Sequence, residues 1–327
     1  MNKLMIHGKD KEFVNIENSI ARDIEKYLAD KSNVIWLDIE APTEEEMDIL
    51  IDTFNFHTIS VEDVIFPHNF PKIESFDDYL FLVIHAISTS DLDSSKISSK
   101  EINVYFGKNY IVTIHEENVR QISSIRQRCK TNPGMMAKGV DFVLHNILDS
   151  IAEGFFPILD MVNEKIDQVE EKVLFGRKNQ KEVMEEILDL KRTLLELRKT
   201  VIPQRNVYGT LTRSEISFIK PKAMIYFRDV YDHMLRITDM IEAYRELLSA
   251  TMEASFTIIS TRMNETMKTL TIIATFMMPL TLITSFYGMN VKAPEFEWGF
   301  FGYLWVCGLM VLIAAGMYLY FKRNKWF

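Results

Sequence analysis

The chain has 327 residues and a formal net charge of -9 at pH 7. Its length allows more than one domain, and its acidic balance argues against a nucleic-acid partner, which would need a basic surface. The seven histidines are scattered without the spacing of a zinc site, and there is no Gly-rich phosphate loop. An enzyme, an ATP-driven pump or a bound cofactor is therefore not indicated.

Charged residues are unevenly distributed. They are frequent from residue 1 to about 265 and nearly absent from about 269 onward until the last six residues, which predicts a soluble part followed by a membrane part. With the strands and helices expected below, the predicted fold class is an α+β membrane protein. Cys129 and Cys307 show no pairing pattern and are expected to be free thiols in a reducing compartment. Because the N-terminal segment lacks an apolar stretch of signal-peptide length, we expect the soluble part in the cytosol.

Residues 1–132 are predicted to form a cytosolic mixed α/β domain. Strands are expected at 34–40, at 79–88, and at 101–106 and 110–116 around a turn at 107–109. A helix is expected after Thr43, because Thr43 and Glu46 have the spacing of a capping box. Residues 91–100 are predicted to be a polar loop and 120–129 a short helix.

Residues 133–220 are predicted to form a cytosolic helical hairpin. Apolar side chains recur every three or four residues along 140–175 and again along 181–202, which indicates two antiparallel helices. Residues 221–268 are predicted to be a stalk helix that continues into the membrane. No proline occurs between Pro221 and Pro279, so one helix of about 85 Å is possible at 1.5 Å per residue; the alternative is a break near 247–250.

Two uncharged runs, 269–287 and 299–321, are each long enough to cross a bilayer core, which needs about 20 residues in a helix. Residues 288–298 between them are too few for a domain, so the spans are expected to form a hairpin with an external loop. The basic tail 322–327, together with Arg262 and Lys268 before the first span, places both termini in the cytosol by the positive-inside rule. The expected location is the inner (plasma) membrane.

One face of the first span is polar, small or flexible at the 3.5-residue spacing of a left-handed bundle. The offset face, which includes Leu270, Ile273 and Met277, is bulky and apolar. This pattern suits either a water-lined pore or ordinary helix packing in lipid. Pro279 leaves the carbonyl of Thr275 without a helical donor, consistent with a kink or a gate. The candidate pore-lining residues are Asn264, Met267, Thr271, Ala274, Met278, Thr281 and Ser285.

A pore would require several copies, because two spans cannot enclose a water path. Neither span contains an ionisable acid, base or histidine, which disfavours a proton-coupled carrier. A divalent cation would instead move down its gradient, driven by about 4.6 kcal/mol at about 100 mV.

The segment "YGMN" at 287–290 follows the proline-containing span and precedes a short acidic loop, a second span and a basic tail. Together with "KTLTIIATFMMPLTLITSFYGMN" (268–290), "YFRDVYDH" (226–233) and "LKRTLLELRKTVIP" (190–203), it resembles the CorA magnesium transporters over nearly the whole chain. The resemblance implies a homopentamer in the lipid bilayer that takes up Mg2+, often with Co2+ or Ni2+.

The resemblance also implies functional residues. Gly288, Met289 and Asn290 would form the selecting ring at the outer mouth, with Tyr287 supporting the turn. Because Mg2+ loses its waters reluctantly, the amide oxygen of Asn290 would bind the hydrated ion through water, with Gly288 permitting the turn that aims it.

Further acidic residues are candidates for attracting or sensing cations. Glu295 matches an acid of the family's external loop and could concentrate cations with Glu297, although the family's "MPEL" reads "APEF" here. Asp229 matches a stretch where family members sense cytosolic Mg2+ as a regulatory ligand. Asp91 and Asp93 are possible partners for Asp229, or simply residues of a solvated loop.

Two alternative functions remain open. A zinc transporter of the same superfamily would have the same architecture. A membrane-anchored receptor or scaffold would leave the polar face of the first span unexplained.

Overall fold

The computed structural model describes residues 2–8, 12–17, 24–66, 70–89, 97–176, 180–213, 216, 219–289, 294–324 and 326. These residues form two compact units, Met1–Met252 and Glu253–Phe327. Helix α8 (Met224–Tyr287) contributes to both units.

The first unit is built on a seven-stranded sheet in the order β2-β1-β3-β7-β6-β5-β4. Strands β3 and β7 pair in parallel, and every other neighbouring pair is antiparallel. The strands are β1 (Asn2–His7), β2 (Phe13–Glu17), β3 (Val34–Glu40), β4 (Lys72–Ser75), β5 (Tyr79–Thr89), β6 (Ile97–Gly107) and β7 (Tyr110–His115).

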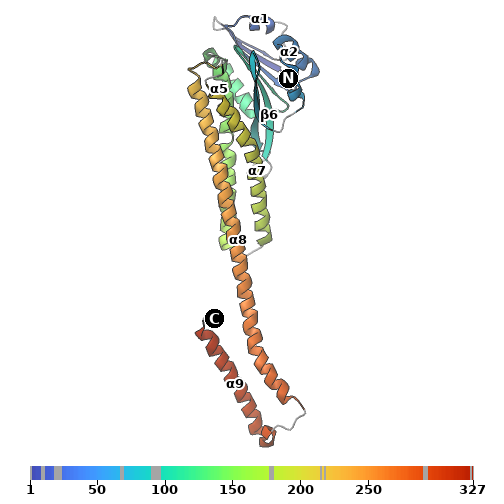
Figure 1. Cartoon of the computed structure of the whole chain (residues 1–327), viewed down its shortest axis with the longest axis vertical. Coiled ribbons are helices and arrows are strands. Elements are labelled where there is room, and N and C mark those ends of the chain that lie inside the picture. The colour runs from blue at the N-terminus through green and yellow to red at the C-terminus, as the bar shows by residue number, and fades with distance from the viewer. Residues whose placement is uncertain are drawn as a thin grey trace. The chain divides into compact units, whose positions relative to one another are not determined.

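Helices cover both faces of this sheet (Figure 1). On one face, α1 (Ile24–Ala29), α2 (Glu44–Phe54) and α3 (Thr58–Ile65) enclose a core in which the rings of Phe56 and Tyr105 stack at 3.9 Å. On the other face, α5 (Val140–Glu153) packs against β3, β5, β6 and β7, and contacts α4 (Arg120–Thr131) and the short helix η1 (Pro133–Lys138). Coverage of both faces explains why the interior of β3 is buried continuously instead of alternating.

The strands predicted at 34–40, 79–88, 101–106 and 110–116 are confirmed, as is the short helix at 120–129. The capping box is also present: Thr43 Oγ1 accepts from the Glu46 amide at 3.3 Å, and Glu46 Oε2 accepts from the Thr43 amide at 2.9 Å. The prediction of a polar loop through residue 100 is wrong, because β6 begins at Ile97 and pairs with the end of β5. Ladder hydrogen bonds involve the backbone, so a polar sequence at the end of a hairpin does not prevent pairing.

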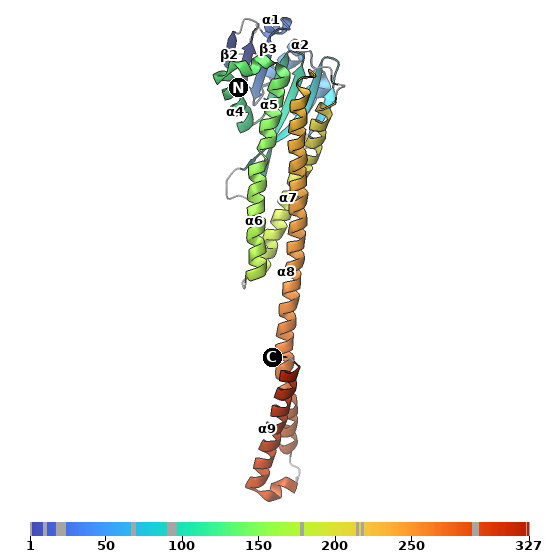
Figure 2. The same ribbon diagram turned by 90° about the vertical axis from the view of Figure 1, so that its left-hand side faces the viewer.

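Residues 140–175 form two helices, α5 and α6 (Phe156–Phe175), where the sequence pattern suggested one. Pro157 lies in the first turn of α6; it has no amide hydrogen, and its ring excludes a regular helix through the preceding residues. Helix α7 (Gln180–Leu211) packs along α6 as the predicted hairpin (Figure 2), with Lys172 Nζ 2.6 Å from Glu186 Oε2.

Helix α8 is continuous over 64 residues, through both 247–250 and Pro279. It is therefore about 96 Å long at 1.5 Å per residue. The long unbroken helix predicted from the lack of prolines is confirmed, and the alternative break at 247–250 is wrong. Its N-terminal half belongs to the core of the first unit through Phe227, Met234 and Ile241.

Three stretches in the described part of the chain are long and apolar enough to cross a membrane: one within Val140–Phe175, one within α8, and α9 (Phe300–Arg323). Over half of the first is buried among other helices, so its apolar side chains are explained by the core of the first unit. The windows in α8 and α9, with mean hydropathies of 1.7 and 2.0, are 0% and 6% buried. Their apolar side chains point outward, as expected for surfaces in contact with lipid or with other helices.

Candidate functional site

In the second unit, the end of α9 contacts the C-terminal part of α8 through one pair of rings. The ring of Phe321 is buried and stacks on Phe276 with centroids 5.6 Å apart. The half-buried residues of α8 in this region lie on the same face at helical spacing. They are Ile272, Phe276, Pro279, Leu280, Ile283 and Tyr287.

The candidate pore-lining residues lie on the opposite face of α8, and all of them are exposed in the single chain. Ala274 precedes the covered Phe276 by two positions, and Met278 precedes Leu280 by two; two positions correspond to about 200° around a helix. The same relation holds for Thr281 with Ile283 and for Ser285 with Tyr287. We call Asn264, Met267, Thr271, Ala274, Met278, Thr281 and Ser285 the polar stripe.

The offset apolar face proposed from the sequence differs from the face that α9 covers. Leu270, Ile273 and Met277 remain exposed, whereas Leu280 and Ile283 are half-buried. The covered face follows the contact with α9, which residue spacing alone does not locate.

Pro279 is accommodated without ending the helix. Threonine hydroxyls nearby donate to backbone carbonyls one turn earlier: Thr271 Oγ1 to Met267 O at 2.8 Å, and Thr275 Oγ1 to Thr271 O at 2.7 Å. Such bonds satisfy the hydroxyl hydrogens within the helix itself.

Helix α8 ends at Tyr287, directly before the Gly-Met-Asn segment. The Gly288 amide still donates to Thr284 O at 2.9 Å, and the Met289 amide donates to Phe286 O at 3.3 Å. Met289 is exposed, and Asn290 lies outside the described residues.

The backbone of Gly288 lacks the positive φ of a left-handed residue, and its role in aiming Asn290 stays a prediction because Asn290 lies outside the described residues. What distinguishes the position is space, since a Cβ atom there would lie 3.0 Å from the carbonyl oxygen of Thr284. A side chain at Gly288 would therefore press against the last turn of α8.

Both candidate acids of the loop lie in the short helix η2 (Pro294–Trp298). Glu295 is half-buried and Glu297 is exposed. Helix η2 packs on the first turns of α9, so the start of α9 holds the loop that carries these acids.

Asp229 is exposed on α8, in the first unit. It lies in a polar region between α5 and α8, where His233 Nδ1 is 3.2 Å from Asp149 Oδ1. Burial lowers the pKa of His145 on α5, against the opposing negative charges of Asp149 and Asp229.

Among the described residues, no group of three or more His, Cys, Asp or Glu side chains could hold a metal ion. Asp91 and Asp93, the possible partners of Asp229, lie outside the described residues. Asp229 is therefore an exposed carboxylate on the surface of the single chain.

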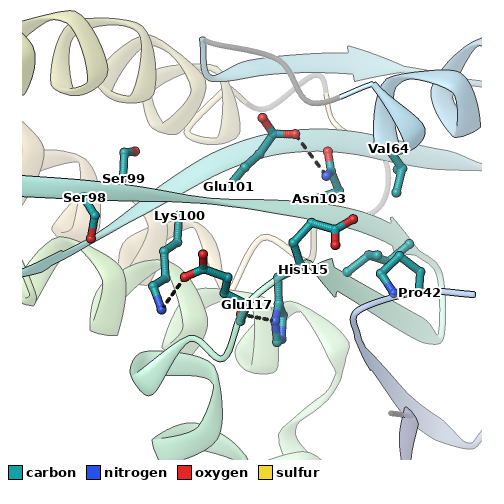
Figure 3. A pocket seen from close by; sticks show the side chains of 11 residues that line it. Pro42, Val64, Ser98, Ser99, Lys100, Glu101, Asn103, His115 and Glu117 are labelled. Carbon is teal, nitrogen blue, oxygen red and sulfur yellow. Dashed lines mark hydrogen bonds and ion pairs between the residues drawn. The ribbon is translucent and has the colours of Figure 1, made fainter. Parts of the chain in front are cut away.

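A polar pocket that sequence reasoning did not identify lies at β6 and β7 (Figure 3). Several of its polar side chains contact one another: Lys100 Nζ is 3.0 Å from Glu117 Oε2, and Asn103 Nδ2 donates to Glu101 Oε1 at 3.2 Å. His115 Nδ1 donates to the Glu117 carbonyl at 2.7 Å. The ion pair between Lys100 and Glu117 joins β6 to the segment that follows β7.

A buried ion-pair network lies behind this pocket. Asp38 on β3 accepts from Arg126 at 2.6 Å and from Thr113 at 2.7 Å, and lies 3.2 Å from His115 Nε2. Burial alone would raise the pKa of Asp38, but His115, Thr113 and Arg126 together hold it below its ordinary value. Trp36 Nε1 donates to Thr113 Oγ1 at 3.0 Å and completes the network.

Replacing Asp38 by asparagine is expected to destabilise the first unit by about 3–5 kcal/mol, because Arg126 and His115 would lose their buried partner. Since the folded pKa of Asp38 is lowered, its contribution to stability is present above the unfolded pKa of about 3.9 and is lost as pH falls toward the folded pKa. The measurement is thermal unfolding of the full-length protein between pH 3 and 7, followed by tryptophan fluorescence.

The matched control is Asp78→Asn, which removes an exposed ion pair with Lys108 at 3.3 Å and should change stability by less than about 1 kcal/mol. Equal effects of the two substitutions, or an Asp38→Asn protein with unchanged acid sensitivity, would contradict the assigned role of the network.

Comparison with known proteins identifies a family whose members resemble this chain. The sequence pattern of the family described as "CorA-like Mg2+ transporter protein" matches residues 31–323. The cobalt/magnesium transport protein CorA of Thermotoga maritima is 34% identical over 309 residues, which cover 93% of this chain and 87% of that protein. The putative metal ion transporter YfjQ of Bacillus subtilis is 32% identical, over 89% of each chain.

The fold agrees with this relationship. The complete structure of the CorA magnesium transporter from Methanocaldococcus jannaschii matches with a TM-score of 0.82 at 25% identity, over 99% of this chain and 98% of that one. The similarity therefore includes both compact units.

Proposed function

Because this chain belongs to the CorA family of membrane-embedded divalent-cation transporters, we propose that it forms a homo-oligomeric channel for uptake of hydrated Mg2+. The proposed oligomer is a pentamer with both termini in the cytosol. Co2+ and Ni2+ are further candidate ions. The driving force is the electrochemical gradient, and the protein acts as a transporter and not as an enzyme.

The observation that carries this proposal is the polar stripe opposite the face covered by α9. Turning Thr281 and Ser285 toward lipid would remove their hydroxyl groups from water without a gain in buried apolar surface. Copies of α8 arranged around an axis would instead place the stripe against water, with α9 outside. The same arrangement would keep α9, which contacts α8 at Phe276, away from the stripe.

We place ion selection at the outer end of α8. A ring of Asn290 amide oxygens and nearby carbonyl oxygens would bind the water shell of Mg2+, which exchanges slowly and prefers oxygen ligands. Gly288 and Met289 would shape this ring, and Tyr287 would support it from the half-buried face. Glu295 and Glu297 would raise the local concentration of cations beside the mouth.

We place regulation in the first unit. Asp229 would bind cytosolic Mg2+ together with acids of a neighbouring chain, with Asp91 and Asp93 as candidates. An ion shared between chains stabilises the state in which those chains are close together. Abundant Mg2+ would thereby favour a closed channel.

The test is uptake by the purified protein in lipid vesicles under an imposed inside-negative potential of about 100 mV. We expect Mg2+ uptake that grows with the potential and slows when the cytosolic side already contains millimolar Mg2+, and Asp229→Asn should weaken that slowing. Faster movement of Zn2+ than of Mg2+ would favour the zinc-transport alternative. Vesicles that remain impermeable to both ions would favour a receptor or scaffold and overturn the proposal.

A further inference from the structure

The external loop joins α9 through a contact that only glycine permits. Gly302, in the first turn of α9, is buried, whereas Phe300, Phe301 and Tyr303 around it are exposed. A Cβ atom built on Gly302 would lie 2.0 Å from the main-chain carbonyl oxygen of Glu295 and 3.8 Å from the Cβ of Trp298.

Such a separation is far inside van der Waals contact. The clashing atom belongs to the backbone, so it cannot move away by a side-chain rotation. Any side chain at position 302 must therefore displace the η2 segment from α9. The other glycines within α9, Gly308 and Gly316, would place a Cβ in open space in the single chain.

The connection between η2 and α9 also depends on Gly299. This residue has φ +56 and ψ -126, which L-residues with side chains rarely adopt. Its carbonyl accepts from the Gly302 amide at 3.2 Å. Gly299 thus sets the direction in which η2 approaches α9, and Gly302 sets how closely it approaches.

We infer that Gly302 is a positioning residue for cation capture: it holds the Glu295 segment against α9 and so fixes where the loop acids stand at the channel mouth. This inference rests on the proposed function, because it assigns the loop a role in that transport. Displacing the segment would move the Glu295 carboxylate while leaving α8 and its stripe unchanged.

The experiment measures initial rates of Mg2+ uptake into vesicles by full-length Gly302→Ala, Glu295→Gln and the double variant. We expect each single variant to raise KM by about fivefold to tenfold, with Vmax at saturating Mg2+ retained, because loop acids act by concentrating the ion. The double variant should match the single variants, because both changes remove the same effect. Gly308→Ala serves as the matched control and should behave as wild type.

A second readout separates positioning from general loosening of the fold. Capture by a surface carboxylate weakens with ionic strength, so the wild-type KM should rise with added NaCl, whereas the KM of Gly302→Ala and Glu295→Gln should respond much less. If Gly302→Ala fails to assemble, Gly299→Ala, which redirects η2 without a steric clash, should show the same rise in KM and the same loss of salt dependence.

An unchanged KM in Gly302→Ala, multiplying effects in the double variant, or a fall in Vmax alone would overturn the inference. Absence of uptake by the wild-type protein would instead overturn the proposed function, so the two failures are distinguishable.

Discussion

Asn290→Ala is expected to reduce Mg2+ uptake by on the order of a hundredfold, because each chain would lose an oxygen that hydrogen-bonds the hydrated ion. A hydrogen bond to a charged partner is worth about 1.5–3 kcal/mol, so a net loss of one or two such bonds in the proposed oligomer corresponds to about a hundredfold. Alanine retains a helix-compatible backbone but offers no side-chain acceptor. The measurement is Mg2+ uptake into vesicles at matched protein content, with the oligomeric state checked in detergent.

Asn324→Ala is the matched control. It removes an asparagine side chain from the C-terminal end of α9 and should leave uptake near the wild-type rate. Retained uptake in Asn290→Ala would argue against selection at this residue. Equal losses in both variants would indicate a general effect on assembly.

The second large effect concerns the polar stripe. A cysteine at Thr281, in a Cys307→Ser background, should react with a membrane-impermeant, positively charged thiol reagent, and the reaction should block uptake. A positive charge about 4 Å from another charge costs about 4 kcal/mol at an effective dielectric constant of 20, so a block on the order of a thousandfold is expected. Cys129 should not interfere, because it is buried and burial raises its pKa to about 11.

Ile283→Cys is the control. Ile283 is half-buried in the single chain and lies about 200° around the helix from Thr281, so in the proposed oligomer it should face away from the water path. A block of uptake by modification at both positions, or at neither, would contradict exposure of the polar stripe to water. Protection of Thr281→Cys by high Mg2+ would further support it.

Much of the architecture was predictable because short sequence patterns determine where individual helices and strands form. The absence of proline between Pro221 and Pro279 predicted a long helix, and the spacing of Thr43 and Glu46 predicted a capped one. Strand β1 was missed because all six of its residues are buried, so it shows no alternating pattern, and β2 and β4 are too short to stand out. The division between α5 and α6 was missed because the apolar period continues across Pro157.

The site was predictable only in part, for a similar reason. Residue spacing identified the stripe from Asn264 to Ser285, because a helical face is a local property. It did not identify the face covered by α9 or the contact between Gly302 and the Glu295 carbonyl, because both depend on how separate segments pack. The position of the Asn290 side chain stays a prediction.

The hydrogen bond donated by the Thr271 hydroxyl group determines what this residue of the polar stripe can offer to solvent. Because its hydrogen is committed to the Met267 carbonyl, the oxygen can offer only lone pairs to whatever stands outside the helix. In the proposed pore, a water molecule beside Thr271 would direct a hydrogen at this oxygen and its own oxygen toward the axis. Water oriented in this way would favour a cation over an anion at this level of the pore without a charged side chain in the wall.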